Sequence, residues 1–128
     1  MNISNQYRLT ALTELADVYP ASLTVAEVAR RRGIPRPFLA RLLADQVRQG
    51  NLVSARGPRG GVCLARAPGE IELAALMPAE SGPRYPSPAA AWLGQRLEEA
   101  QSGALRSLTL EHLVRIERQR GDGADYEI

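Results

Sequence analysis

The stretch Arg56-Gly57-Pro58-Arg59-Gly60-Gly61 stands between two short runs of strand-forming residues, Leu52 to Ala55 and Val62 to Ala65. Glycine reaches positive φ and proline pre-sets a turn angle, so this density of both predicts a tight β-hairpin. The hairpin carries two arginines and no acidic residue. Its charge therefore favours contact with a polyanion.

A helix-turn-helix pattern immediately precedes this hairpin. Thr24, with Glu27 three residues later, forms a capping box that opens a short helix, and Gly33 stands where that helix is expected to end. A second helix begins at the prolines around residue 36, because proline is tolerated in a first turn, and ends at Gly50. Helix, glycine turn, helix and arginine-tipped hairpin follow one another as in a winged helix-turn-helix domain. We predict that DNA-binding domain over residues 1–68.

Beyond residue 68 the pattern predicts further helices. A short one around 71–77 is stopped by Pro78, and a proline-rich loop follows over 78–88. The segment 88–102 is predicted to be a helix that Gly103 ends, and Thr109 is predicted to cap a last helix. The tail 121–128 lacks periodicity and is predicted to be disordered. The predicted fold class is mainly α with a small β-hairpin: a winged helix-turn-helix plus C-terminal dimerisation helices over 69–120.

The size and composition of the chain limit its class. It has 128 residues, 45% of them hydrophobic, enough for one domain or for one small domain with an oligomerisation element. No apolar run exceeds five residues, and the first residues lack a basic-then-apolar signal pattern. We therefore predict a cytoplasmic protein that has no membrane partner.

Charge is distributed unevenly along the chain. Residues 1–66 hold ten arginines and four acidic residues, a balance of +6, whereas residues 67–128 hold six arginines and ten acidic residues, a balance of −4. All 16 basic residues are arginines. The basic half is suited to nucleic acid, because arginine makes bidentate contacts with phosphate and guanine.

No pattern in the sequence indicates catalysis or a bound metal. Cys63 is the only cysteine and His112 the only histidine, so the chain lacks the ligand set of a structural zinc or an iron–sulfur cluster. Neither a nucleophile–base pair nor a phosphate-cradling glycine loop is present. We predict a protein that is not an enzyme and that has no catalytic residue, no metal site and no cofactor.

Several motifs together match one family over nearly the whole chain. The most specific is the hairpin Arg56-Gly57-Pro58-x-Gly60-Gly61, and the early helix Tyr7 to Ala16 and the C-terminal Leu108-Thr109-Leu110 also match. In these motifs the chain resembles the IscR/BadM-type winged-helix transcriptional regulators, the Rrf2 family. The resemblance implies dimers that bind near-palindromic operators, with a long helix, here about 88–102, packed against the partner subunit.

The chain departs from the family pattern at three places. Well-known members carry three cysteines in the loop before the long helix, where they hold an iron–sulfur cluster, whereas the loop 78–88 contains none. Arg59 stands where the wing usually has another glycine, and Val62 where it has an aromatic residue. The recognition helix lacks the usual Ser or Thr at its start and the Glu or Gln along it. Family operator preferences are therefore not transferred to this chain.

Two binding surfaces are predicted. Recognition-helix residues are expected at base edges in the major groove, wing arginines in the adjacent minor groove, and Arg31 at a phosphate. The residues predicted to contact double-stranded DNA are Arg31, Arg36, Pro37, Phe38, Ala40, Arg41, Arg56, Gly57, Arg59 and Gly60. The residues predicted to form the homodimer contact are Trp92, Leu93, Leu97 and Ala100. For Trp92, a place in the core of its own chain is an equal alternative.

Two functions remain open on the sequence. The first is a sequence-specific DNA-binding transcriptional regulator, a dimeric repressor without an iron–sulfur cluster, whose signal is a small molecule, a partner protein or nothing. The second is a winged-helix module that binds a protein through its acidic half, with little or no DNA binding. The arginine-rich wing favours the first. The sequence identifies neither the operator, the regulated genes nor the effector.

Overall fold

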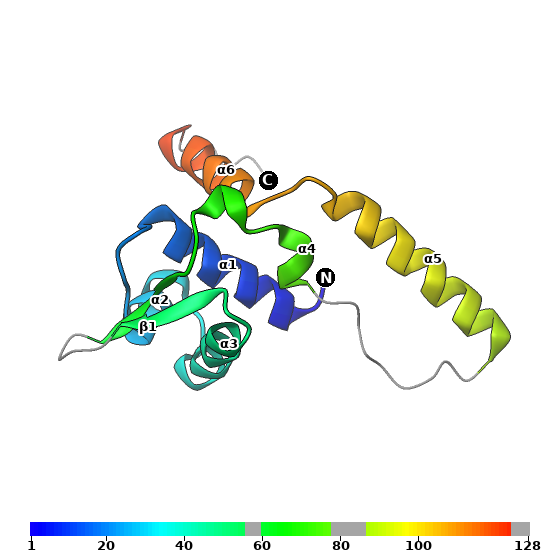
Figure 1. Cartoon of the computed structure of the whole chain (residues 1–128), viewed down its shortest axis with the longest axis horizontal. Coiled ribbons are helices and arrows are strands. Elements are labelled where there is room, and N and C mark those ends of the chain that lie inside the picture. The colour runs from blue at the N-terminus through cyan, green and yellow to red at the C-terminus, as the bar shows by residue number, and fades with distance from the viewer. Residues whose placement is uncertain (56–59, 78–86, 124–128) are drawn as a thin grey trace.

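The computed structural model describes residues 1–55, 60–77 and 87–123, with side chains up to residue 120. Figure 1 shows a bundle of helices with a small hairpin at one end and a long helix standing away at the other. The elements are α1 (Ile3–Asp17), α2 (Val25–Arg32), α3 (Arg36–Arg48), β1 (Leu52–Ala55), β2 (Gly61–Leu64), the 3₁₀ turn η1 (Pro68–Glu70), α4 (Leu73–Leu76), α5 (Pro88–Leu105) and α6 (Leu110–Gly123).

The predicted capping residues form the helix ends of the helix-turn-helix. Thr24 Oγ1 accepts a hydrogen bond from the Glu27 N–H at 3.1 Å, and the Glu27 carboxylate accepts from the Thr24 N–H, which completes the capping box of α2. Gly33 ends that helix with a φ of 66°, a left-handed conformation that glycine adopts without steric cost. These two predictions are confirmed.

A backbone bridge joins the hairpin to the segment just ahead of the helix-turn-helix. Val62 and Leu64 of β2 are buried, while Cys63 between them is half-buried, as the alternation predicts. Leu23, just ahead of α2, exchanges backbone hydrogen bonds with Val62 at 3.0 and 2.9 Å. At Gly61 a Cβ would lie 2.5 Å from the Leu23 carbonyl oxygen, so the approach requires glycine.

One hydrophobic core joins the two ends of the chain. Figure 1 shows α1 between α3 and α6, and its Leu12 and Leu15 are fully buried. The C-terminal part enters the same core through Ile71 and Leu110, where the Leu110 N–H donates to the Ile71 carbonyl at 3.1 Å. We call α1 to α4, the hairpin and α6 together the body.

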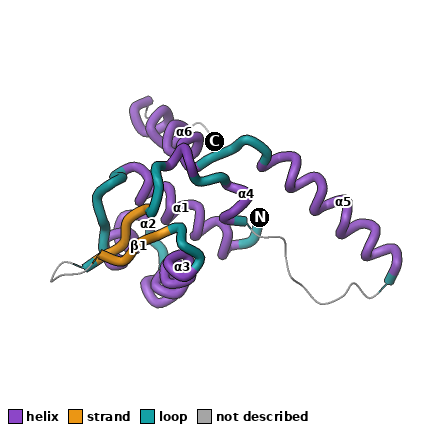
Figure 2. Tube along the Cα trace, viewed as in Figure 1, coloured by secondary structure: helices purple, strands orange, loops and turns teal. Residues whose placement is uncertain are grey.

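Helix α5 lies apart from the body, as Figure 2 shows, and we call it the arm. Of its residues only Gly94 is buried. The large side chains Trp92, Leu93 and Leu97 are 61%, 51% and 62% exposed. Neither the arm nor any other described helix is long and apolar enough to cross a membrane.

The predicted end of the long helix at Gly103 is wrong. Helix α5 continues to Leu105, because one glycine costs a helix only about 1 kcal/mol and Ala104 and Leu105 favour the helix again. The turn comes later, at Ser107, which adopts a φ of 66°.

Two other predicted boundaries also differ. Helix α6 runs to Gly123, beyond residue 121, where the tail was expected to begin, and residues 124–128 lie outside the described ranges. The helix expected over 71–77 is confined to α4, because Ile71 is extended where its carbonyl accepts the hydrogen bond from Leu110.

Candidate nucleic-acid interface

The first two turns of α3 present one exposed face of the body. Pro37 lies in the first turn, where its missing N–H has no helical partner to lose. Leu39 and Leu43 are buried and hold the helix against the core. Positions four residues apart share a helix face, so the exposed residues form one patch with two cations. They are Arg36, Pro37, Ala40 and Arg41.

Phe38 occupies a different position from these four residues. It is half-buried, and its ring meets the ring of Tyr7 edge-on, with centroids 5.5 Å apart at 74°. The guanidinium carbon of Arg41 lies 5.8 Å from the Phe38 centroid, within the range of a cation–π contact. Phe38 therefore contacts the guanidinium of Arg41 and links α3 to α1 through Tyr7.

The arginines at the end of α2 differ in their availability. Arg31 is exposed and lies 3.8 Å from Glu27 one turn earlier, a weak surface pair that leaves the guanidinium accessible. Arg32 turns toward α1 and α6, where it lies 3.5 Å from Glu14 and 3.1 Å from Glu117. Arg31 can reach a phosphate from this position, whereas Arg32 is held by two carboxylates.

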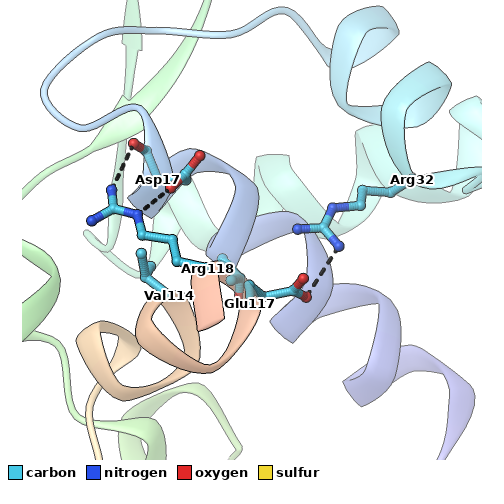
Figure 3. Close-up of a pocket in the computed structure, with 6 residues that line it drawn as sticks. Asp17, Arg32, Val114, Glu117 and Arg118 are labelled. Carbon is cyan, nitrogen blue, oxygen red and sulfur yellow. Dashed lines mark hydrogen bonds and ion pairs between the residues drawn. The ribbon is translucent and has the colours of Figure 1, made fainter. Parts of the chain in front are cut away.

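Glu117 belongs to a charged clamp that joins α6 to α1 and α2. Arg118 Nε donates to Asp17 Oδ1 at 2.8 Å, and Arg32 Nη1 donates to Glu117 Oε1 at 3.1 Å (Figure 3). The cavity of about 200 Å³ between them is lined by these charged side chains. Since each cation has a carboxylate partner, the clamp joins helices rather than offering a charged ligand site.

Of the wing residues predicted to contact DNA, the structure describes Gly60. Arg56, Gly57 and Arg59, three of the predicted contacts, lie outside the described ranges. Gly60 is exposed and directly precedes β2. The described strands on either side, Leu52–Ala55 and Gly61–Leu64, pair antiparallel next to the helix-turn-helix.

Sequence reasoning missed a buried polar junction at the other end of the hairpin. Asn51 donates through Nδ2 to Gln46 Oε1 at 2.9 Å, and its Oδ1 accepts from Arg66 Nη2 at 3.2 Å. Gln46 and Asn51 are 1% and 6% exposed. The signal was present in the sequence as a glutamine on the apolar face of the recognition helix, but a pattern of hydrophobic residues does not pair it with Asn51.

The cysteine and the histidine of the chain do not fit the ligand set of an iron–sulfur cluster. Cys63 lies on β2, and His112 lies in the first turn of α6, where its Nδ1 accepts from the Thr109 N–H at 3.1 Å. In the part of the chain that the structure describes, no three His, Cys, Asp or Glu side chains converge on one point. Thiolate clusters need several ligands at one place.

The residues predicted for a dimer contact lie together on the arm. Trp92, Leu93, Leu97 and Ala100 are all exposed, and the guanidinium carbon of Arg96 lies 5.1 Å from the Trp92 ring. Within the described chain, Trp92 is thus outside the core.

Comparison with known proteins assigns the chain to a family. Residues 1–116 match the Rrf2 family, described as iron-dependent transcriptional regulators. An rrf2-like HTH-type transcriptional regulator of Rhodobacter capsulatus is 39% identical over 87 residues, which cover 65% of this chain but only 58% of that protein. An HTH-type transcriptional regulator of Synechocystis is 33% identical over an alignment of 145 positions. The alignment covers 98% of this chain and 97% of that protein.

The fold agrees with a solved structure of the same type. The structure of T. potens IscR superposes with a TM-score of 0.76 at 23% identity, covering 90% of this chain and 85% of that one. Its winged helix-turn-helix confirms the predicted fold class of helices with one small antiparallel hairpin. With residues 1–116 matched to the family and a relative aligned over almost its full length, this chain belongs to the Rrf2 family of transcriptional regulators.

Proposed function

We propose that the chain is a sequence-specific DNA-binding transcriptional regulator that acts in the cytoplasm as a homodimeric repressor. The observation that carries the proposal is the exposed face of α3, where Arg36 and Arg41 stand on a helix whose opposite side is anchored in the core. A recognition helix needs this combination, because its base contacts are only as well placed as the helix itself.

The exposed arginines suit guanine. Arg36 and Arg41 can each pair bidentately with guanine O6 and N7 in the major groove, worth roughly 1–3 kcal/mol of discrimination per contact. Ala40 between them offers only a methyl group, which fits a thymine methyl. Arg31 supports the complex at a phosphate, and the wing arginines Arg56 and Arg59 enter the neighbouring minor groove.

The homodimer rests on the arm. Its apolar residues Trp92, Leu93, Leu97 and Ala100 are exposed on one helix, and a second copy brings an identical stripe. Two copies present two recognition helices, which explains a near-palindromic operator with half-sites about one helical turn apart.

The proposed regulator works without an iron–sulfur cluster. The whole chain contains one cysteine and one histidine, and these two residues lie on β2 and α6. The signal is instead a small molecule, a partner protein or none.

Selection from a random duplex pool tests the proposal. The purified protein is expected to enrich one near-palindromic sequence, and its affinity for that duplex is expected to fall steeply as the salt concentration rises, because phosphate contacts release counterions. Equal affinity for the enriched duplex and a scrambled duplex would contradict the proposal, and an absence of DNA binding would favour a module that binds protein.

Replacing Arg41 tests the recognition helix. Arg41→Ala is expected to weaken binding to the enriched duplex by about 1–3 kcal/mol and to relax the preference at one base position. Arg48→Ala is the matched control, since Arg48 is an exposed arginine in the last turn of the same helix. Equal losses in both variants, measured by fluorescence anisotropy, would remove Arg41 from base recognition.

Replacing the wing arginines tests the hairpin. Arg56→Ala is expected to cost more affinity than Arg59→Ala, because only Arg56 stands at the family's wing position. Each change is expected to reduce the slope of log affinity against log salt by roughly one unit. Unchanged slopes in both variants would exclude the wing from the interface.

A further inference from the structure

The polar groups of Asn51 are bonded on two sides at the point where the recognition helix meets the hairpin. The Asn51 N–H donates to the Gln46 carbonyl at 3.0 Å, and Nδ2 donates to Gln46 Oε1 at 2.9 Å. The Asn51 carbonyl accepts from the Ala65 N–H at 3.0 Å, and Oδ1 accepts from Arg66 Nη2 at 3.2 Å. Two bonds thus lead to α3, and two lead to the residues that follow β2. We call Gln46, Asn51 and Arg66 the junction.

The two amides of the junction are buried, at a place where an apolar contact would serve stability equally well. Gln46 is 1% exposed and Asn51 6% exposed, and Leu43 on the same helix and Leu52 next to Asn51 are buried too. A paired buried amide adds little net stability over an apolar pair of similar shape, because both groups must leave water. What hydrogen bonds add is direction, since their strength falls off with distance and angle, whereas apolar packing tolerates small shifts.

The junction lies where α3 meets the hairpin, so the direction of its hydrogen bonds affects how the hairpin is oriented. Helix α3 ends at Arg48 and β1 begins at Leu52, so a rotation at Asn51 changes the orientation of the whole hairpin relative to the recognition helix. The other end of the hairpin is fixed by the bridge between Leu23 and Val62. The junction and this bridge together set the angle between the two elements.

We propose that Gln46, Asn51 and Arg66 are positioning residues that hold the wing at the angle needed to contact DNA together with α3. The inference rests on the proposed function, because two elements that enter neighbouring grooves must keep one spacing. The junction touches no DNA itself. It acts through the recognition helix and the hairpin that it joins.

A double substitution separates positioning from stability. Gln46→Met and Asn51→Leu alone are each expected to lower the melting temperature, since each leaves a buried amide group of its partner unbonded. The double variant is expected to regain the wild-type melting temperature, because both polar groups are replaced by apolar groups of similar size. The probe is the duplex enriched by the wild-type protein, with a scrambled duplex of the same composition for comparison.

The ratio of the two affinities is the decisive measurement. The double variant is expected to lose about tenfold in its preference for the enriched over the scrambled duplex, similar to the loss of one bidentate base contact. A double variant that regains both the melting temperature and the preference would overturn the proposal, because the junction would then serve stability alone.

Arg66→Ala tests the same proposal at an exposed residue and puts the fold at little risk. It is expected to lower the preference ratio about threefold, in line with the small net contribution of one partly buried hydrogen bond. Arg48→Ala is its control, because it removes the same charge from an exposed arginine nearby. The control is expected to change both affinities equally. If both variants leave the ratio unchanged, the guanidinium of Arg66 has no positioning role.

Hydrogen exchange keeps this test independent of DNA binding. In the double variant the Ala65 amide is expected to exchange about tenfold faster, while amides in α1 keep the wild-type rate. If the wild-type protein enriches no duplex, the proposed function fails. Unchanged exchange of the Ala65 amide in the double variant would overturn the positioning role of the junction, whatever the result with DNA.

Discussion

Helices α1 and α5 have similar lengths, 15 and 18 residues, but their apolar residues meet opposite surroundings. In α1, Leu12 and Leu15 are fully buried between α3 and α6. In α5, Trp92 and Leu97 are more than 60% exposed, and Gly94 is the one buried residue of the helix. The body therefore buries Leu12 and Leu15 within one chain, whereas the arm leaves its large apolar residues exposed.

We propose that this difference separates the part that folds within one chain from the part that packs against a second copy. An isolated helix of this length is marginal in water, because most helical stability in proteins comes from packing an apolar face. The arm is tied to the body at one end, near α4, and its stripe of exposed residues is available to a partner (Figure 1). A second copy, as we propose, gives the arm the packing that α1 obtains from the body.

The largest expected effect comes from a substitution that disrupts the proposed dimer contact of the arm. Leu97→Asp places a charge in the middle of the stripe, so the protein is expected to sediment at the monomer mass of 13.9 kDa at micromolar concentration. Its affinity for the enriched duplex is expected to fall by at least about a hundredfold, because the advantage of two linked half-sites is lost.

Gln95→Asp is the control for this change. It adds the same charge to an exposed residue on the other side of α5 and is expected to remain dimeric. A wild-type protein that is monomeric at the same concentration would refute the dimer, and a dimeric Leu97→Asp variant would place the contact elsewhere.

A leucine-to-alanine pair sharpens the contrast between the body and the arm. Leu15→Ala is expected to cost about 2–5 kcal/mol of unfolding free energy, because it opens a cavity in the core. Leu93→Ala, at an exposed position, is expected to cost under about 0.5 kcal/mol in dilute protein. Its effect is expected to grow with protein concentration as dimers form. Urea unfolding at two concentrations measures both, and equal losses in dilute protein would show that the arm packs within its own chain.

The smallest expected effect concerns the clamp between α6 and the rest of the body. Arg118→Ala removes the pair with Asp17, whose side chains are both about half exposed, and is expected to cost at most about 1 kcal/mol. Arg115→Ala removes a pair within α6 itself and is expected to cost less. Thermal melting at low and high salt checks this, since the difference between the variants is expected to shrink as salt screens the charges. A loss of several kcal/mol in Arg118→Ala would mean that α6 depends on the clamp rather than on Leu110 and Val114.

Local signals in the sequence predicted the helix ends and strands of the helix-turn-helix and hairpin well. The Thr24 capping box, the left-handed Gly33 and the paired strands around residues 56–60 depend on neighbours within a few residues, so their physics can be read from a short window. The exposed set Arg36, Pro37, Ala40 and Arg41 follows from helical periodicity. The contact of Phe38 with Tyr7, 31 positions earlier in the chain, has no local signature.

By itself the sequence determined the order of elements, the arginine-rich face and hairpin, and the single cysteine that argues against a cluster. Only the tertiary structure decided which polar residues meet: Arg32 with Glu117, Arg118 with Asp17, and Asn51 with Gln46 and Arg66. Periodicity describes which face of an element is apolar, and caps describe where it ends. Which charged or amide groups face each other depends on how the elements pack, and that is set by the whole core at once.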